Sequence, residues 1–206
     1  MKQKVIQEFF DKQIVKVNVS EPFILTSGKT SPVYIDHRKI FSFPMLRDLI
    51  FDLWTQVLTQ NHPNINYNHV VFAGTATAGI APAYGLASKL GAGFVYVRSK
   101  PKGHGLKALV EGFVPEGSQI IVVDDMVTTG GSILQAVDSL KKEFPHSVVL
   151  CATSISRHES ESTIKNFQDN HCSLVSLFRV PEIFEIAFNT GLIDKSTFEV
   201  IKKNPA

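Results

Sequence analysis

The residues best suited to chemistry lie together in one run, from Asp124 through Ser132. Two adjacent carboxylates, Asp124 and Asp125, follow the apolar residues 120–123, which predict a buried strand. Threonines and glycines then lead into residues 131–143, whose apolar positions have helical spacing. Because ligands of open α/β sheets bind beyond the carboxyl ends of the strands, this run is a candidate binding site.

The chemistry of this run suits a sugar phosphate. Backbone N–H groups and the dipole at a helix start bind phosphate, and glycines let the backbone approach it closely. The hydroxyls of Thr128, Thr129 and Ser132 add donors. Asp124 and Asp125 would repel a phosphate that touched them, so they suit neighbouring hydroxyls or a cation. Neither a Walker loop nor Gly-x-Gly-x-x-Gly is present; the alternative is a surface turn before a helix cap.

A second candidate is the basic segment that contains Arg98, Lys100, Lys102 and His104. These four potential cations repel one another and need an anionic partner. Arginine and lysine are strong phosphate donors, so pyrophosphate is a suitable partner. His104 can donate as a cation or exchange a proton near pH 7. The alternatives are a solvated hairpin and a nucleic-acid patch, but no aromatic residues interleave the charges.

Composition excludes several classes of protein. The chain has 206 residues, 44% of them apolar, and a net charge of +2, which argues against disorder and whole-surface attraction to nucleic acid or lipid. Two cysteines exclude a disulfide scaffold and favour a reducing, cytoplasmic compartment. Residues 1–12 lack the apolar core of a signal peptide, and the uncharged residues 70–88 contain too many glycines, threonines and prolines for a membrane span.

The elements that position both candidates alternate between strand and helix. Continuous apolar runs predict five buried strands, at residues 70–73, 94–97, 120–123, 148–152 and 173–178. Helical segments are predicted between them, at residues 79–90, 131–143 and 159–170. This alternation predicts an α/β fold with a parallel β-sheet flanked by helices.

The residues outside this pattern are expected to form a small hood over one end of the sheet. Residues 1–12 have an apolar helical face, residues 23–25 and 32–36 predict short strands around the turn 26–30, and Ser42 is expected to cap a helix that continues through Leu58. We expect one domain, 1–206. Its N-terminal segment 1–68 contributes the hood, 69–179 form the sheet core, and 180–206 form a helical cap.

Four segments carry a resemblance to a known family. The run from Asp124 through Ser132 resembles the phosphoribosyl-pyrophosphate motif of type I phosphoribosyltransferases. Residues 23–36, 73–80 and 96–105 are similar to three segments of orotate phosphoribosyltransferases, namely the N-terminal signature, the pyrophosphate loop and the mobile catalytic loop. The four segments occur in the family's order and span most of the chain.

The resemblance implies the type I phosphoribosyltransferase fold and a reaction. The phosphoribosyl group would pass from phosphoribosyl pyrophosphate to orotate, giving orotidine 5′-phosphate and pyrophosphate in de novo pyrimidine (UMP) biosynthesis. It implies a Mg²⁺ cofactor held mainly by substrate and water, with no protein metal ligands. Its partners would be small-molecule substrates, without nucleic acid or membrane, and a second copy of the chain in a homodimer that shares the catalytic loop across its interface.

The resemblance also assigns site residues. The implied catalytic residues are Lys102, His104, Arg98 and Asp125. The implied contacts of the sugar donor are Arg98, Lys100, Lys102, His104, Asp124, Asp125, Met126, Val127, Thr128, Thr129, Gly130, Gly131, Ser132 and Thr77. The implied contacts of orotate are Thr128, Arg157, Tyr34 and Ile35. Many members have a lysine directly after the arginine of the loop; here Ser99 occupies that place and Lys100 follows.

Two other functions fit the same motif. One is a phosphoribosyltransferase for a purine base, against which segment 23–36 argues. The other is a non-catalytic regulator that senses phosphoribosyl pyrophosphate; the absence of a helix-turn-helix pattern and the intact basic segment argue against it. Taken alone, Arg157 could be a solvent-facing residue at a helix start, and Tyr34 and Ile35 could be strand core.

Overall fold

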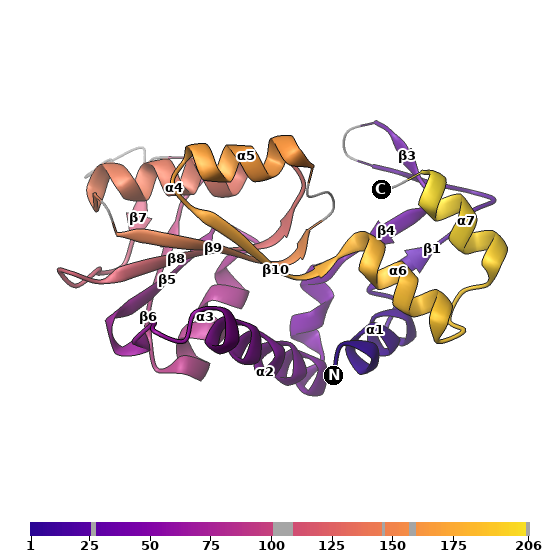
Figure 1. The fold of residues 1–206 in the computed structure, drawn as a ribbon, viewed down its shortest axis with the longest axis horizontal. Coiled ribbons are helices and arrows are strands. Elements are labelled where there is room, and N and C mark those ends of the chain that lie inside the picture. The colour runs from indigo at the N-terminus through magenta and orange to yellow at the C-terminus, as the bar shows by residue number, and fades with distance from the viewer. Residues whose placement is uncertain (26–27, 101–108, 146, 157–159, 205–206) are drawn as a thin grey trace. The chain divides into compact units, whose positions relative to one another are not determined.

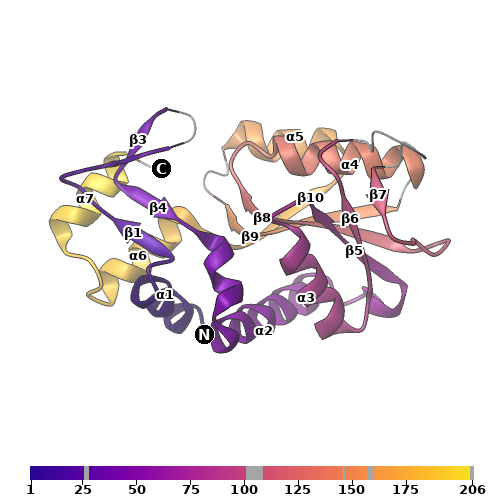
Figure 2. The same cartoon turned by 180° about the vertical axis from the view of Figure 1, so that it is seen from behind.

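The computed structural model describes residues 1–25, 28–100, 109–145, 147–156 and 160–204. Two compact units make up the chain, one of residues 1–53 and 178–206 and the other of residues 54–177. Figure 1 shows the path of the chain through both units, and Figure 2 shows it from behind. Among the described residues, no helix combines the length and apolar character that crossing a membrane requires.

A six-stranded sheet, in the order β10-β9-β8-β5-β6-β7, forms the centre of the second unit. Its strands are β5 (Val70–Thr75), β6 (Gly93–Val97), β7 (Val110–Glu111), β8 (Gln119–Val127), β9 (Val148–Ser156) and β10 (Ser173–Arg179). β5 pairs in parallel with β6 and β8, and β8 pairs in parallel with β9, whereas β7 is antiparallel to β6. The predicted α/β fold is confirmed, and β7 is a short edge strand that no sequence pattern predicted.

Helices cover both faces of this sheet. α4 (Gly131–Glu143) and α5 (Glu161–Asp169) lie over one face and α3 (Ile80–Leu90) over the other, as both views show. Val71, Ile120 and Val122 are therefore buried almost completely. Burial on both faces explains why these strands are continuous apolar runs rather than alternating ones.

The first unit contains most of the remaining elements. They are α1 (Lys2–Asp11), β1 (Val15–Val17), β2 (Phe23–Ile24), β3 (Thr30–Ser31), β4 (Val33–Ile35), the 3-10 helix η1 (His37–Ser42), α6 (Val180–Asn189) and α7 (Lys195–Lys203). α2 (Pro44–Asn61) begins in this unit and ends in the other, where the 3-10 helix η2 (Tyr67–His69) follows. Val5, Ile6 and Phe9 form the buried face of α1, as predicted. The ring of Phe9 lies 5.5 Å from that of Phe178.

The predicted strands 23–25 and 32–36 are present as β2 and β4. They do not pair with each other, because β2 pairs with β3 and β4 pairs with β1. Pro32, which has no N–H to donate, separates β3 from β4. Ser42 ends η1 instead of capping α2, which begins at Pro44. Proline favours the first helical position, which leaves the residue before it, Phe43, at the helix boundary.

Candidate functional site

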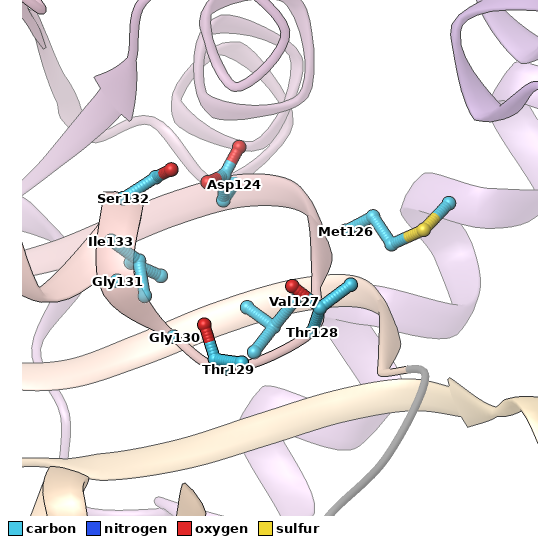
Figure 3. A pocket seen from close by; sticks show the side chains of 9 residues that line it. All are labelled: Asp124, Met126, Val127, Thr128, Thr129, Gly130, Gly131, Ser132 and Ile133. Atoms are coloured by element: carbon cyan, nitrogen blue, oxygen red, sulfur yellow. The ribbon is translucent and has the colours of Figure 1, made fainter. Parts of the chain in front are cut away.

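A hollow of about 130 Å³ lies where β8 gives way to α4. Figure 3 shows the chain curling around it from the end of β8 into the first turn of α4. The described residues that line it are Asp124, Met126, Val127, Thr128, Thr129, Gly130, Gly131, Ser132 and Ile133. The structure therefore gathers most of the predicted sugar-phosphate run around one cavity.

Gly130 makes the turn into α4 possible. Its φ of +85° lies in the left-handed region, and a Cβ at this position would lie 2.8 Å from Cε2 of Phe167. The first intrahelical hydrogen bond of α4 runs from the N–H of Leu134 to the carbonyl of Gly130. The N–H groups of residues 131–133 have no partner within the helix, so together with the helix dipole they suit an anion.

Asp124 is the charged residue of this hollow. Its side chain is buried near the end of β8, and Oδ1 accepts a hydrogen bond from the N–H of Asp125 at 2.9 Å. Burial raises the pKa of Asp124 to about 7; the hydroxyl of Thr75 opposes this shift and the negative charge of Asp125 adds to it. Asp124 therefore exchanges its proton near neutral pH and can either donate a hydrogen bond or accept one.

Asp125 is not among the described residues that line this hollow. Both carboxylates belong to β8, which continues to Val127, and successive side chains of a strand point to opposite faces. The Oδ1 atom of Asp125 accepts a hydrogen bond from the N–H of Met126 at 2.8 Å. The structure thus brings Asp124, but not Asp125, together with the threonine-glycine loop.

A second hollow, of about 100 Å³, adjoins the first through a shared residue, Ser132. It lies between the ends of β5 and β6 and one face of α4, and is lined by Thr75, Ala76, Val97, Arg98, Ser99, Leu109, Ser132, Gln135, Ala136 and Ser139. Of the predicted contacts, Arg98 lines it, whereas Thr77 is exposed and is not among its described lining residues.

Arg98 is held at the base of the basic segment. Its N–H donates to the carbonyl of Leu109 at 2.9 Å, which joins the two ends of the segment. Its Nη1 lies 3.5 Å from Oε1 of Glu111, and its Nε donates to the carbonyl of Lys100 at 3.3 Å. The guanidinium is thus oriented beside the second hollow, where a phosphate group could take it as a donor.

The other predicted site residues are placed as follows. Lys100 is exposed next to Arg98, and Lys102, His104 and Arg157 lie outside the described residues. Tyr34 and Ile35 lie on β4 of the first unit, where the ring of Tyr34 is 5.7 Å from that of Phe23.

Sequence reasoning missed four polar residues near the two hollows: Thr75, Glu111, Gln135 and Ser139. The signal for Gln135 and Ser139 was available, because they follow Ser132 at intervals of three and four residues and so share its helix face. Thr75 becomes a neighbour of Asp124 only because β5 pairs with β8, and Glu111 becomes a neighbour of Arg98 only because β7 pairs with β6.

Comparison with known proteins gives a consistent picture. Residues 46–178 match the family model of the phosphoribosyl transferase domain. The orotate phosphoribosyltransferase of Lactococcus lactis subsp. cremoris (strain MG1363) is 35% identical over 199 residues, which cover 97% of this chain and 92% of that protein. The orotate phosphoribosyltransferase of Streptococcus pneumoniae serotype 4 is 36% identical over 191 residues, 93% of this chain and 88% of that one.

Solved structures agree on the fold. The crystal structure of orotate phosphoribosyltransferase from Aeropyrum pernix has a TM-score of 0.74 and 28% identity, covering 92% of this chain and 99% of that chain. Leishmania donovani UMP synthase has a TM-score of 0.77 and covers 98% of this chain, but this chain spans only 41% of it. At 19% identity, the second likeness shows the fold alone.

Proposed function

This chain belongs to the orotate phosphoribosyltransferase family, and we propose that it transfers the 5-phosphoribosyl group of phosphoribosyl pyrophosphate to N1 of orotate. The products are orotidine 5′-phosphate and pyrophosphate, a step of de novo pyrimidine biosynthesis. One observation carries the proposal: a buried carboxylate, Asp124, shares a cavity with the threonine-glycine loop at the start of α4. This pairing fits a sugar that bears a phosphate.

The 5-phosphate of the sugar donor binds in the first hollow. The N–H groups of residues 131–133 and the hydroxyls of Thr128, Thr129 and Ser132 supply donors for it. Asp124 accepts a hydrogen bond from a ribose hydroxyl in this hollow. The assignment of Asp125 to the ribose rests on the resemblance to the family, because its side chain does not line the hollow. Positive charge develops on the sugar as the bond at the anomeric carbon breaks, and an ionised carboxylate nearby stabilises that charge more than it stabilises the ground state.

The leaving pyrophosphate binds on the side of the second hollow. Arg98 lines this hollow, and Ser132 connects it to the phosphate loop. Arg98 and Lys100, together with Lys102 and His104 contributed by the second copy of the chain proposed below, stabilise the negative charge that grows on the leaving group. The resemblance to the family's catalytic loop implies that this segment also excludes water during the reaction and so limits hydrolysis of the sugar donor.

Orotate is recognised by Thr128, Arg157, Tyr34 and Ile35. Thr128 is exposed and lines the first hollow, which supports its place beside the sugar. The assignments of Arg157, Tyr34 and Ile35 rest on the resemblance of their segments to the family. A guanidinium such as that of Arg157 suits the orotate carboxylate because it can donate two parallel hydrogen bonds.

The direct test of the function is an absorbance assay with orotate, phosphoribosyl pyrophosphate and Mg²⁺. We expect orotate absorbance to fall, and one molecule of pyrophosphate to accumulate for each molecule of orotate consumed. Adenine and hypoxanthine serve as control substrates, because turnover of either without turnover of orotate would indicate a purine transferase. Binding of the sugar donor with no turnover of any base would indicate a sensing protein and would contradict the proposal.

Lys102→Ala is expected to lower turnover by at least about 100-fold, because an ammonium no longer meets the leaving pyrophosphate. Steady-state kinetics measure the loss, and thermal melting should match that of the parent. Lys165→Ala, which removes an exposed lysine from α5, is the matched control and should keep full activity. Near-normal turnover of Lys102→Ala would refute the role of this lysine.

Magnesium is the proposed cofactor. When bound, it would neutralise part of the negative charge of the pyrophosphate group, and as a hard ion it would keep several waters. Within the described ranges no three His, Cys, Asp or Glu residues are grouped to hold a metal ion, and we assign the ion to substrate and water. A chelator should therefore abolish turnover without changing the melting of the free protein. Full turnover in excess chelator would contradict this proposal.

The proposed assembly is a homodimer in which the segment that contains Lys102 serves the partner's site. Each site then needs two chains, so a Lys102→Ala chain and an Asp125→Ala chain should complement each other. Mixing the two inactive variants under conditions of subunit exchange should restore about a quarter of the parent activity. About half of the dimers then contain one chain of each variant, and in each of these mixed dimers one of the two sites is intact. Subunit exchange without any recovery of activity would contradict a catalytic segment shared between subunits.

We also propose a reducing, cytoplasmic setting, which the two free thiols support.

A further inference from the structure

The two cysteines of the chain lie in contact inside the second unit, and neither is among the described residues that line the two hollows of the proposed site. Cys151 is on β9, in register with Val122 of β8, and Cys172 directly precedes β10. Their Sγ atoms are 3.7 Å apart, both thiols are free, and both side chains are buried, with Cys151 fully enclosed and Cys172 7% exposed. Residues 21 positions apart in sequence thus form a vicinal dithiol.

We propose that Cys151 and Cys172 form a redox-modification site that a hydroperoxide converts into an intramolecular disulfide. The contact distance leaves only a short movement of the two sulfurs before a bond of about 2.05 Å can form. Both residues belong to the same core cluster, where Leu140 and Phe167 also pack. The bond would join the middle of β9 to the start of the edge strand β10.

The surroundings give the two sulfurs different roles. Cys151 donates its S–H toward the sulfur of Cys172, and this hydrogen bond lowers the pKa of Cys172 while it raises that of Cys151. Burial opposes this lowering of the Cys172 pKa; the ammonium of Lys141, which donates to the carbonyl of Asn170, adds to the lowering, and the carboxylate of Asp138 opposes it. Cys172, the more accessible of the two, is therefore the attacking thiolate and Cys151 the resolving thiol.

The oxidation takes place in two steps. The thiolate of Cys172 attacks one oxygen of the hydroperoxide, the O–O bond breaks, and Cys172 becomes a sulfenic acid while the leaving oxygen departs as hydroxide or alkoxide. The thiol of Cys151 then attacks the sulfenic sulfur, forms the S–S bond and releases water. Two electrons pass from the two thiols to one hydroperoxide. A dithiol reductant reverses the change by thiol–disulfide exchange.

The test treats the folded, unmodified protein with hydrogen peroxide and follows free thiols and intact mass. Both thiols should disappear together, the mass should fall by two hydrogens, peptide mapping should find Cys151 joined to Cys172, and dithiothreitol should restore the starting protein. A urea-unfolded sample shows that the peroxide dose is sufficient. Retention of both thiols in the folded protein at that dose, or bonds only between chains, would overturn the proposal.

Two serine variants test separately which sulfur attacks the hydroperoxide and which one resolves the sulfenic acid. In Cys151→Ser, Cys172 should stop at the sulfenic acid, which dimedone traps. In Cys172→Ser, the remaining thiol should react at least about tenfold more slowly than the thiols of the parent, because it is enclosed and lacks the neighbouring nucleophile. Equal rates for Cys172→Ser and the parent would contradict Cys172 as the attacking group.

Discussion

Replacing Asp124 by asparagine is expected to lower turnover by at least about 100-fold while making the free protein more stable at about pH 8. Asparagine has nearly the same shape and keeps the oxygen that accepts from the N–H of Asp125. It cannot carry the negative charge that stabilises the cationic sugar. The catalytic loss therefore follows from charge alone, and kcat measured with orotate and the sugar donor reports it.

The stability gain follows from the buried position of Asp124. Its pKa is about 7 in the folded protein against an ordinary value of 3.8. Between pH 3.8 and about pH 7, Asp124 has lost its proton in the unfolded state but keeps it in the folded state. Because the folded state binds more protons, the free energy of unfolding falls as pH rises through this range. The stabilising contribution of the protonated acid is full below about pH 4 and is lost as pH rises through about 7. Asparagine does not titrate, so Asp124→Asn avoids this loss.

Urea unfolding of the parent and of Asp124→Asn at about pH 4 and about pH 8 measures this difference. The gap in unfolding free energy should widen in favour of the variant as pH rises, by an amount on the order of a few kcal/mol. Asp138→Asn, an exposed carboxylate of α4, is the matched control and should change neither turnover nor the pH dependence. A variant that keeps parental turnover, or whose stability gap does not change with pH, would contradict the account.

Gly79→Ala is expected to cost about 3 kcal/mol of folding free energy or more. Gly79 lies between β5 and α3, and a Cβ there would lie 2.7 Å from the backbone N of Thr75 and still closer to its hydroxyl and to the carbonyl oxygen of Val123. These backbone atoms belong to the paired strands β5 and β8, so relief requires the strands to move. Because Val123 directly precedes Asp124, turnover should fall as well.

Thermal melting and urea unfolding measure the loss in Gly79→Ala. Gly131→Ala is the matched control for stability, since the nearest atom to its added Cβ, the Thr129 hydroxyl, is 3.8 Å away. That variant should unfold within about 1 kcal/mol of the parent. Melting of Gly79→Ala at the parental temperature would mean that the strands and helix are packed less tightly here than the structure indicates.

The sheet could be predicted from the sequence because of how its strands are buried. Ile120, Ile121 and Val122 are fully enclosed, and only a strand with helices on both faces is apolar at successive positions. β1 and β7 could not be predicted, because strands of three and two residues are defined by their partners, β4 and β6, and not by a local pattern. Their pairing is a tertiary effect.

The candidate site was predicted in part. The loop chemistry of Thr129, Gly130 and Ser132 was visible because side-chain type and helix start are local properties. The apolar pattern predicted a strand that ends before Asp124, but β8 pairs with β9 as far as Val127 and Ser156. That pairing is set by the neighbouring strand, and it places the two carboxylates on alternate faces. The high pKa of Asp124 was also hidden from the sequence, because it depends mainly on burial.

A crystal structure of this protein with orotidine 5′-phosphate would test most directly where the sugar phosphate binds. We expect the phosphate to lie in the hollow between β8 and α4, within hydrogen-bond distance of the N–H groups of residues 131–133, with a ribose hydroxyl on the carboxylate of Asp124. A phosphate bound elsewhere in a fully occupied complex, with this hollow left to solvent, would contradict the account.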